Sequence, residues 1–275
     1  MKTVKIDAHH HVMKKTGYVE ELLEHYDRIG IAKVCLQELP ASIRGFDQHS
    51  IIGDAVRKWP ERVVGFAHLN LGSSKPEDVL RLKEEGFRGL KCILPPKPYH
   101  DESYFDLYAA AEELGLILLF HLGIVARSLV RVRVDNNFMR PVYLDTIARM
   151  FPQLPIIGAH LGNPWYEEAA MVCRWNPNLF FDITGSTLKA KTPEFIGRLL
   201  WWGKAQEYYY TGNDPWEKIV FGTDVAYKDA EDVINDYDNL MTKLELVDEK
   251  RDLVWGGTMS RLLAGERPKP FSKMS

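Results

Sequence analysis

The sequence predicts an α/β protein that folds as a single (β/α)8 TIM barrel, and three observations lead to this prediction. Short apolar runs typical of strands alternate with segments that carry apolar residues at helical spacing, and this alternation repeats eight times along the 275 residues. The strand runs are too uniformly apolar to have a solvated face, which is typical of parallel strands covered on both sides. No glycine-rich nucleotide loop follows the first run, which disfavours an open, doubly wound sheet.

The first four units establish the alternation. Residues 4–11 alternate apolar and polar side chains as a strand does. Residues 17–29 carry apolar residues at helical spacing and stop at Gly30, a helix stop signal. The next strands are expected at 32–37, 62–69 and 87–94, and the helices between them at 46–58 and 76–85.

The last four units repeat this pattern. A helix at 103–114 ends at Gly115 and leads into the apolar run 116–121, the fifth strand. The remaining strands are expected at 155–160, 179–183 and 218–224. The remaining helices are expected at 141–150, 165–174, 192–206, 230–244 and 248–263.

The composition is that of a soluble globular protein, with 45% hydrophobic and 27% charged residues. Barrels of this kind run to about 200–250 residues as one domain, so residues 1–264 are assigned to the barrel and 265–275 to a peripheral C-terminal tail. Three scattered cysteines, no leader and no long apolar run predict a cytoplasmic protein without a membrane partner. A net charge of -3 gives no basic surface for nucleic acid.

Ionisable residues fall at the ends of several predicted strands. His9 and His11 end the first strand and share one face, His121 and His160 end the fifth and sixth, and Asp224 ends the eighth. The carboxyl ends of all barrel strands meet at one mouth, where active sites lie. Imidazole and carboxylate groups are good ligands for zinc and related cations. The sequence therefore predicts a shared site for a divalent metal at this mouth.

Four motifs resemble the amidohydrolase superfamily. They are the start Asp7-Ala8-His9-His10-His11, Leu119-Phe120-His121, Gly158-Ala159-His160-Leu161-Gly162 and Phe221-Gly222-Thr223-Asp224. They are most similar to the branch that includes 2-amino-3-carboxymuconate 6-semialdehyde decarboxylase, γ-resorcylate decarboxylase and 2-pyrone-4,6-dicarboxylate lactonase, in register from the first strand to about Tyr227. Members of this branch often have Thr-Asp-Tyr-Pro at the eighth strand, whereas this chain continues with Val225-Ala226. The loop after Asp224 is therefore expected to differ.

The resemblance implies a ligand set and a catalytic pair. His9, His11, His121 and Asp224 are expected to hold one divalent metal ion, Zn²⁺ first and Mn²⁺ as the alternative, and His160 is expected to face the substrate and move protons. Such a site with an open position lowers the pKa of bound water and polarises a carbonyl group.

Two reactions fit this set, with Asp224 and His160 as catalytic residues in both. In the first, a metal-activated water attacks an ester, lactone or amide carbonyl of a small, carboxylate-bearing substrate. The alternative is non-oxidative decarboxylation of a small aromatic or unsaturated acid, in which His160 or Asp224 gives a proton to the carbon that loses CO₂. We expect the hydrolase. A non-catalytic metal-binding barrel is the third option, because fold does not determine function.

The expected partner is a small-molecule substrate, and three cationic residues are candidates to bind it. Lys91, in the fourth strand, is expected to contact a substrate carboxylate; the alternatives are a carbamylated lysine that bridges two metals, or a stem that packs in the barrel. Arg131 and Arg133 follow the fifth strand and are expected to clamp a carboxylate, unless they are simply solvated. The aromatic stretch 201–216 is a lid, a homodimer or higher homo-oligomer interface, or a segment packed on the barrel wall.

Overall fold

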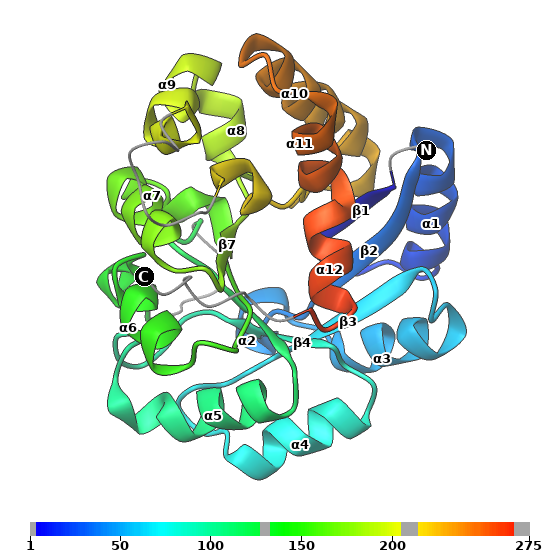
Figure 1. Cartoon of the computed structure of the whole chain (residues 1–275). Coiled ribbons are helices and arrows are strands. Elements are labelled where there is room, and N and C mark those ends of the chain that lie inside the picture. The colour runs from blue at the N-terminus through cyan, green and yellow to red at the C-terminus, as the bar shows by residue number, and fades with distance from the viewer. Residues whose placement is uncertain (1–3, 127–132, 205–213, 267–275) are drawn as a thin grey trace.

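The structure is a computed structural model that describes residues 4–126, 133–204 and 214–266. Seven parallel strands lie side by side in sequence order in one curled sheet (Figure 1). The strands are β1 (Lys5–His10), β2 (Ile31–Gln37), β3 (Val63–His68), β4 (Gly89–Cys92), β5 (Ile117–Phe120), β6 (Ile156–Gly158) and β7 (Leu179–Phe181). Each lies within a predicted strand or within one residue of it, so this part of the prediction is confirmed.

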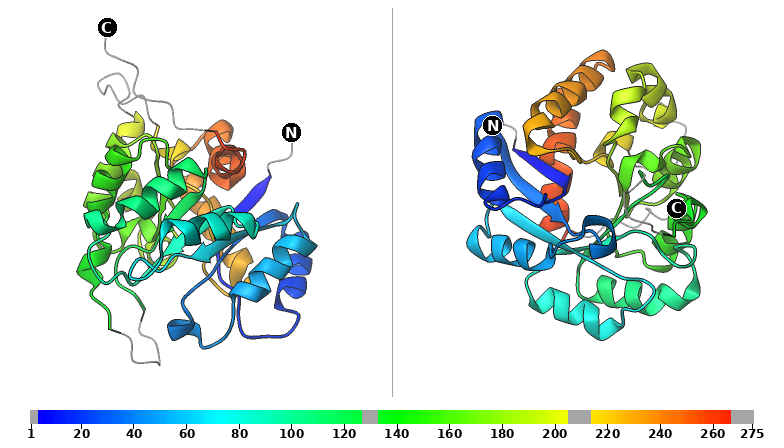
Figure 2. Two further views of the ribbon diagram at one scale, coloured as in Figure 1. Left: turned by 90° about the horizontal axis from the view of Figure 1, so that it is seen from below. Right: turned by 180° about the vertical axis from the view of Figure 1, so that it is seen from behind.

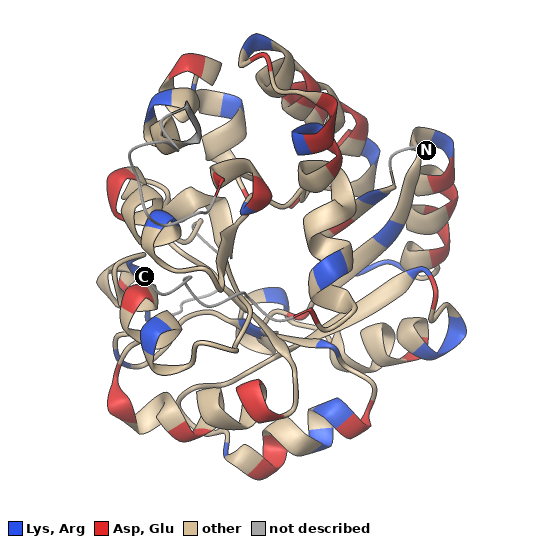
Figure 3. Ribbon diagram, in the orientation of Figure 1, with Lys and Arg blue, Asp and Glu red and all other residues tan. Residues whose placement is uncertain are grey.

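Helices surround the outer face of the sheet, except that α12 packs against the cluster inside its curl (Figure 1). They are α1 (Tyr18–Ile29), α2 (Ala41–Arg44), α3 (His49–Lys58), α4 (Pro76–Glu84), α5 (Phe105–Glu113), α6 (Tyr143–Met150), α7 (Tyr166–Trp175), α8 (Ser186–Ala190), α9 (Pro193–Leu199), α10 (Ala230–Lys243), α11 (Asp248–Asp252) and α12 (Thr258–Leu263). Acidic and basic residues are mixed along these helices (Figure 3). Among the described helices, none is long and apolar enough to span a membrane.

The predicted eighth strand is not formed as a regular strand among the described residues. In the segment 218–224, here the closing segment, Ile219 makes an isolated parallel bridge with Phe181 of β7. The ladder goes no further because the Phe221 amide donates to the carbonyl of Val254, 2.9 Å away, instead of to a strand. Asp224 then turns the chain with a φ of 48°.

The closing segment nevertheless connects the two edges of the sheet. On one side, the Val220 amide donates to the carbonyl of Phe181, at 2.9 Å. On the other, the Ala8 amide of β1 donates to the carbonyl of Phe221, at 2.9 Å, and the Asp224 amide donates to the carbonyl of His9, at 2.8 Å. The closing segment therefore lies where an eighth strand was expected.

Some predicted helices have different bounds. The predicted helix 46–58 begins only at His49 and is preceded by the short α2, and the predicted helix 192–206 ends at Leu199 and is followed by a 3₁₀ turn at Trp201–Lys204. In the aromatic stretch 201–216, Trp202 and Trp216 are buried, as packing on the barrel wall requires, whereas residues 205–213 lie outside the described residues. Most of the predicted tail, from residue 267 on, also lies outside them.

The core has two parts on the two faces of the sheet. A larger apolar cluster fills the space between the sheet and the outer helices. A smaller cluster inside the curl contains Ile6, Ala8, Phe66 and Val220, and α12 adds Met259 and Leu262 to it. Because α12 covers this cluster, the opposite face, to which the strands' carboxyl ends point, is left for a site (Figure 2).

Candidate metal centre

A β-bulge in β1 determines which side chains reach the interior. Asp7 pairs with Val34 of β2 and His10 with Leu36, so three steps on β1 match two on β2. A bulge of this kind redirects a side chain. Ala8 lies in the interior cluster, and His9 follows it toward the same side, whereas the His10 ring is turned outward to the Tyr18 hydroxyl of α1, at 2.9 Å.

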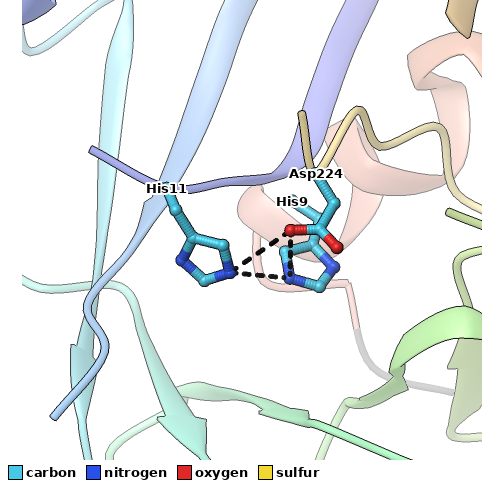
Figure 4. Close-up of side chains that lie close together, drawn as sticks. All are labelled: His9, His11 and Asp224. Atoms are coloured by element: carbon cyan, nitrogen blue, oxygen red, sulfur yellow. Dashed lines mark hydrogen bonds and ion pairs between the residues drawn. The ribbon is translucent and has the colours of Figure 1, made fainter. Parts of the chain in front are cut away.

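Three predicted ligands converge at the end of β1 (Figure 4). The Nε2 atoms of His9 and His11 are 3.2 Å apart. Asp224 Oδ1, from the closing segment, lies 3.5 Å from His11 Nε2 and 3.9 Å from His9 Nε2. These three atoms form a group that could hold a metal ion.

The hydrogen bonds of the two rings fit a cation at this position. His9 Nδ1 lies 2.9 Å from Asp182 Oδ2, and His11 Nδ1 lies 2.9 Å from the carbonyl of Gln37. Because these oxygens only accept, each Nδ1 donates, and each Nε2 of a neutral ring carries a lone pair. Burial first, and the charges of His9 and Lys91 next, hold the pKa of His11 well below its usual range, so it is neutral. Lone pairs and a carboxylate oxygen therefore face one another, as around a metal ion.

His121 lies at the same site but outside this group. Its ring centroid is 5.0 Å from that of His160, and its Nε2 is buried without a hydrogen-bond partner among the described residues. Burial, and then the charge of His160, hold its pKa well below the usual range. A buried imidazole nitrogen without a partner, on a neutral ring, is suited to a metal, and its assignment as the fourth ligand stays a prediction.

His160 is not on a strand but in a 3₁₀ turn, Ala159–Gly162, directly after β6, with a φ of 60°. Its amide donates to Asp182 Oδ1 at 2.9 Å, and its Nδ1 lies 2.7 Å from Thr184 Oγ1. Thr184 Oγ1 in turn donates to Asp182 Oδ1 at 2.6 Å, so His160 Nδ1 is the donor and Nε2 is free to accept. His160 Nε2 lies 3.9 Å from Asp224 Oδ2. Backbone strain of this kind is concentrated at functional sites.

Asp182 connects both halves of the site, although the sequence did not single it out. It follows β7, is fully buried, and contacts His9, His160 and Thr184. Burial by itself would raise its pKa, but the charges of His9 and His160 and the hydrogen bonds from His9 and Thr184 outweigh this and hold the pKa below its usual range. His9, His160 and Asp182 form a second group that could hold an ion. The available signal was a carboxylate directly after the apolar run 179–181.

Lys91 reaches the centre from β4. It is fully buried, and its Nζ lies 3.1 Å from His9 Nε2. Burial lowers the pKa of Lys91 to about 8, while Asp224 and Asp182 oppose the shift. The structure thus brings Lys91 beside the ligands, and its role toward a substrate or a metal stays a prediction.

Neither of the two predicted arginines is found at this centre in the part of the chain that the structure describes. Arg131 lies outside the described residues, and Arg133 is exposed. Another arginine, Arg44 at the end of α2, is half-buried; its Nη1 lies 3.5 Å from Met13 Sδ, and its Nε is buried with no acceptor among the described residues. Within the described ranges, no carboxylate lies at ion-pair distance from its guanidinium. The charge of Arg44 contributes to the lowered pKa of His11, which places it within electrostatic reach of the ligands.

A comparison with known families and structures is consistent with this geometry. A family model described as amidohydrolase matches residues 6–263. No curated protein matches the sequence.

Three solved structures share the fold. The chain is 17% identical to an uncharacterised TIM-barrel protein, Bb4693, from Bordetella bronchiseptica, with a TM-score of 0.69, covering 90% of this chain and 83% of that one. It is 13% identical to 5-carboxyvanillate decarboxylase LigW from Sphingomonas paucimobilis, with a TM-score of 0.67 and coverages of 96% and 99%. It is 12% identical to a 5-carboxyvanillate decarboxylase from Novosphingobium aromaticivorans complexed with manganese and 4-hydroxy-3-methoxy-5-nitrobenzoic acid, with a TM-score of 0.63 and 96% of each chain covered.

Proposed function

The chain belongs to the amidohydrolase family, and on this premise we propose that it is a divalent-metal-dependent hydrolase. Its substrate is a small, carboxylate-bearing ester, lactone or amide. The observation that carries the proposal is the convergence of His9 Nε2, His11 Nε2 and Asp224 Oδ1, three acceptor atoms within 4.8 Å of one another. Zinc or manganese fits these ligands, and manganese is the ion in one of the similar structures.

The ligands and the bases have separate tasks. His9, His11 and Asp224 hold the ion, with His121 adding a fourth nitrogen. When bound, such an ion supplies Lewis-acid activation of water and of a carbonyl group. Asp182 and the carbonyl of Gln37 fix the ring orientations of His9 and His11, since a hydrogen bond at Nδ1 directs Nε2 to the ion.

Asp224 and His160 move the proton. Asp224 Oδ2 accepts it from the attacking water, and His160 Nε2, 3.9 Å away, takes it over and gives it to the leaving group. Burial lowers the pKa of His160, against the opposing charges of Asp182 and Asp224, so its ring starts neutral and able to accept. The hydrogen bond from His160 Nδ1 to Thr184 holds the ring in the required tautomer.

The substrate carboxylate is bound on the cationic side of the site. Arg44 has guanidinium donors without an acid partner among the described residues, and a guanidinium binds a carboxylate through two parallel hydrogen bonds. Lys91, whose Nζ lies 3.1 Å from His9 Nε2, would assist in its ammonium form. Arg131 and Arg133 remain proposed contacts from the loop after β5.

Decarboxylation of a small acid is the second candidate, and one finding favours it. The two decarboxylases with a similar fold are covered over at least 96% of their length. In this reaction, Asp224 in its protonated form, or His160 after taking up a proton at Nε2, gives a proton to the carbon that loses CO₂, and the same ion ligands serve.

One experiment tests both candidates. The purified protein is loaded with zinc or manganese, its metal content is measured by elemental mass spectrometry, and it is incubated in H₂¹⁸O with lactones, esters, amides and phenolic acids. Incorporation of ¹⁸O into the organic product indicates hydrolysis, whereas CO₂ release without such incorporation indicates decarboxylation. Asp224→Asn should abolish turnover, and Asp54→Asn, whose side chain is 75% exposed, should not. Failure to bind a metal would overturn the proposal.

A further inference from the structure

A buried carboxylate lies directly behind the metal ligands. Asp7, on β1 two residues before His9, is fully buried. Its Oδ1 accepts hydrogen bonds from the amides of His9 and Thr223, each at 3.0 Å. Its Oδ2 accepts from Thr223 Oγ1 at 2.7 Å and from the Tyr26 hydroxyl of α1 at 2.6 Å. All four bonds go to one side chain.

These bonds join segments that the sheet itself joins weakly. The closing segment has an isolated bridge to β7, and two backbone hydrogen bonds, from Ala8 and Asp224, connect it with β1. Asp7 adds two more bonds to this connection, both to Thr223, the residue before Asp224. Asp7 also accepts a hydrogen bond from the amide of His9. The Asp7 carboxylate therefore accepts hydrogen bonds from the amide of His9, one proposed ligand, and from the amide of Thr223, the residue before Asp224, another proposed ligand.

We propose that Asp7 is a positioning residue for the metal centre. Its carboxylate fixes the closing segment against β1 and so sets the separation between Asp224 and the pair His9 and His11 before the ion binds. The inference rests on the proposed metal-dependent function and goes beyond it, because Asp7 contributes no ligand and faces away from the ion.

The residue type follows from the donors around it. Four N–H and O–H groups point at this side chain, and an ionised carboxylate is the side chain that only accepts. In Asp7→Asn, an NH₂ group replaces one oxygen, so two of these groups lose their acceptor unless the hydroxyls turn around. His10 Nδ1 lies 3.0 Å from Thr223 Oγ1 and 3.1 Å from the Tyr26 hydroxyl, so this turning would also change the hydrogen bonds of His10. The lost hydrogen bonds weaken the connection between β1 and the closing segment, which is called the joint below.

The test is a set of variants measured for metal affinity. Asp7→Asn and Thr223→Val should each weaken binding of Zn²⁺ by about 10–100-fold, the range for residues that orient ligands. Tyr26→Phe is the matched control: it removes one donor to the same carboxylate but leaves the joint intact, and it should change the affinity less than about threefold. The Kd is measured by competition with a chromophoric chelator, and the visible spectrum of bound Co²⁺ reports ligand geometry.

The outcomes separate this inference from the proposed function. If the unaltered protein binds no metal, both are overturned. If it binds metal and Asp7→Asn and Thr223→Val bind it equally well with the same Co²⁺ spectrum, only the role of Asp7 is overturned. If Asp7→Asn does not fold, Thr223→Val decides alone, because it keeps the backbone bond to Asp7. A loss of affinity of the same size in Tyr26→Phe would indicate general destabilisation and would also count against the role.

Discussion

Asp182 is hydrogen-bonded to both His9, a proposed metal ligand, and His160, the proposed proton carrier. It accepts from His9 Nδ1 at 2.9 Å and, through Thr184, orients His160. Asp182→Asn should therefore weaken metal binding by about 10–100-fold, because an amide is a weaker acceptor and no longer selects the ring tautomer. Chelator competition measures this, with Asp145→Asn on α6 as the control. Equal affinities of the two variants would contradict the role.

Arg44 offers a second test at the level of single residues. Its Nε is buried and has no acceptor in the part of the chain that the structure describes, and an unmade hydrogen bond of this kind costs about 1–3 kcal/mol. A bound carboxylate removes that cost, so Arg44→Gln should raise KM for an acidic substrate by about tenfold or more and change kcat less. Arg62→Gln, which removes a surface pair with Asp27, is the control. An unchanged KM would place the carboxylate elsewhere.

His9, His11 and Asp224 could be predicted together from the sequence because all strands of a barrel end at one face. Asp182 could not be singled out, because one carboxylate after an apolar run carries no sign of the two histidines that it contacts. Arg44 was equally hidden: nothing in the sequence shows that a short helix follows β2 or that its arginine has no acid partner within the described ranges. The missing information is the identity of tertiary neighbours.

At the level of elements, the strands could be predicted more fully than their irregularities. Apolar runs identify β1 to β7, because burial on both faces demands such runs. The bulge in β1 has no such signal: it depends on the match between β1 and β2, and it turns His9 to the side of Ala8. The closing segment has a strand-like sequence, but the amide of Phe221 is taken by Val254. Long-range partners decide both features.

Gly222 shows how closely the closing segment approaches β1. A Cβ at this position would lie 2.9 Å from the Cβ of His9 and 3.0 Å from Thr184 Cγ2. Gly222→Ala should therefore push the segment away, destabilise the fold by about 1–3 kcal/mol and weaken metal binding. Gly53→Ala in α3 is the matched control: its nearest neighbour is Arg57 Nη1 at 3.4 Å, and it should stabilise the protein by about 0.5–1 kcal/mol. Urea unfolding and chelator competition measure the two effects, and unaltered binding by Gly222→Ala would be inconsistent with so tight a fit.

The molecule as a whole should lose stability in acid because it buries neutral histidines. Burial lowers the pKa of His68 to about 4 and that of His10 to about 3. In the unfolded chain these rings take up protons near pH 6.5, so stability falls as the pH drops from about 6.5 toward 4 and is unaffected by these groups above that range. Urea unfolding of the metal-free protein between pH 4.5 and 7.5 measures this slope.

Two variants should affect that slope differently. His68→Gln should make the loss in acid shallower by up to about 1.4 kcal/mol per pH unit, the contribution of one proton. His49 has the opposite sign: burial would lower its pKa, but Glu38 and Glu85, each 2.9 Å away, raise it. Its stabilisation is complete below about pH 6.5 and is lost as the pH rises through the folded pKa. His49→Gln should thus lower the stability by a constant amount below about pH 6.5 and leave the slope in acid unchanged. Identical slopes for the two variants would rule out this assignment.

The joint between β1 and the closing segment also has a consequence for the newly made chain. Asp7 and Thr223 are 216 positions apart, and at about 5–20 residues per second a ribosome needs on the order of 10–40 s to go from one to the other. During that interval His9 and His11 have been synthesised, but Asp224 and the joint that orients it have not. If the proposed function holds, the site is therefore completed late in translation, and a nascent chain that stalls before the closing segment carries His9 and His11 without Asp224.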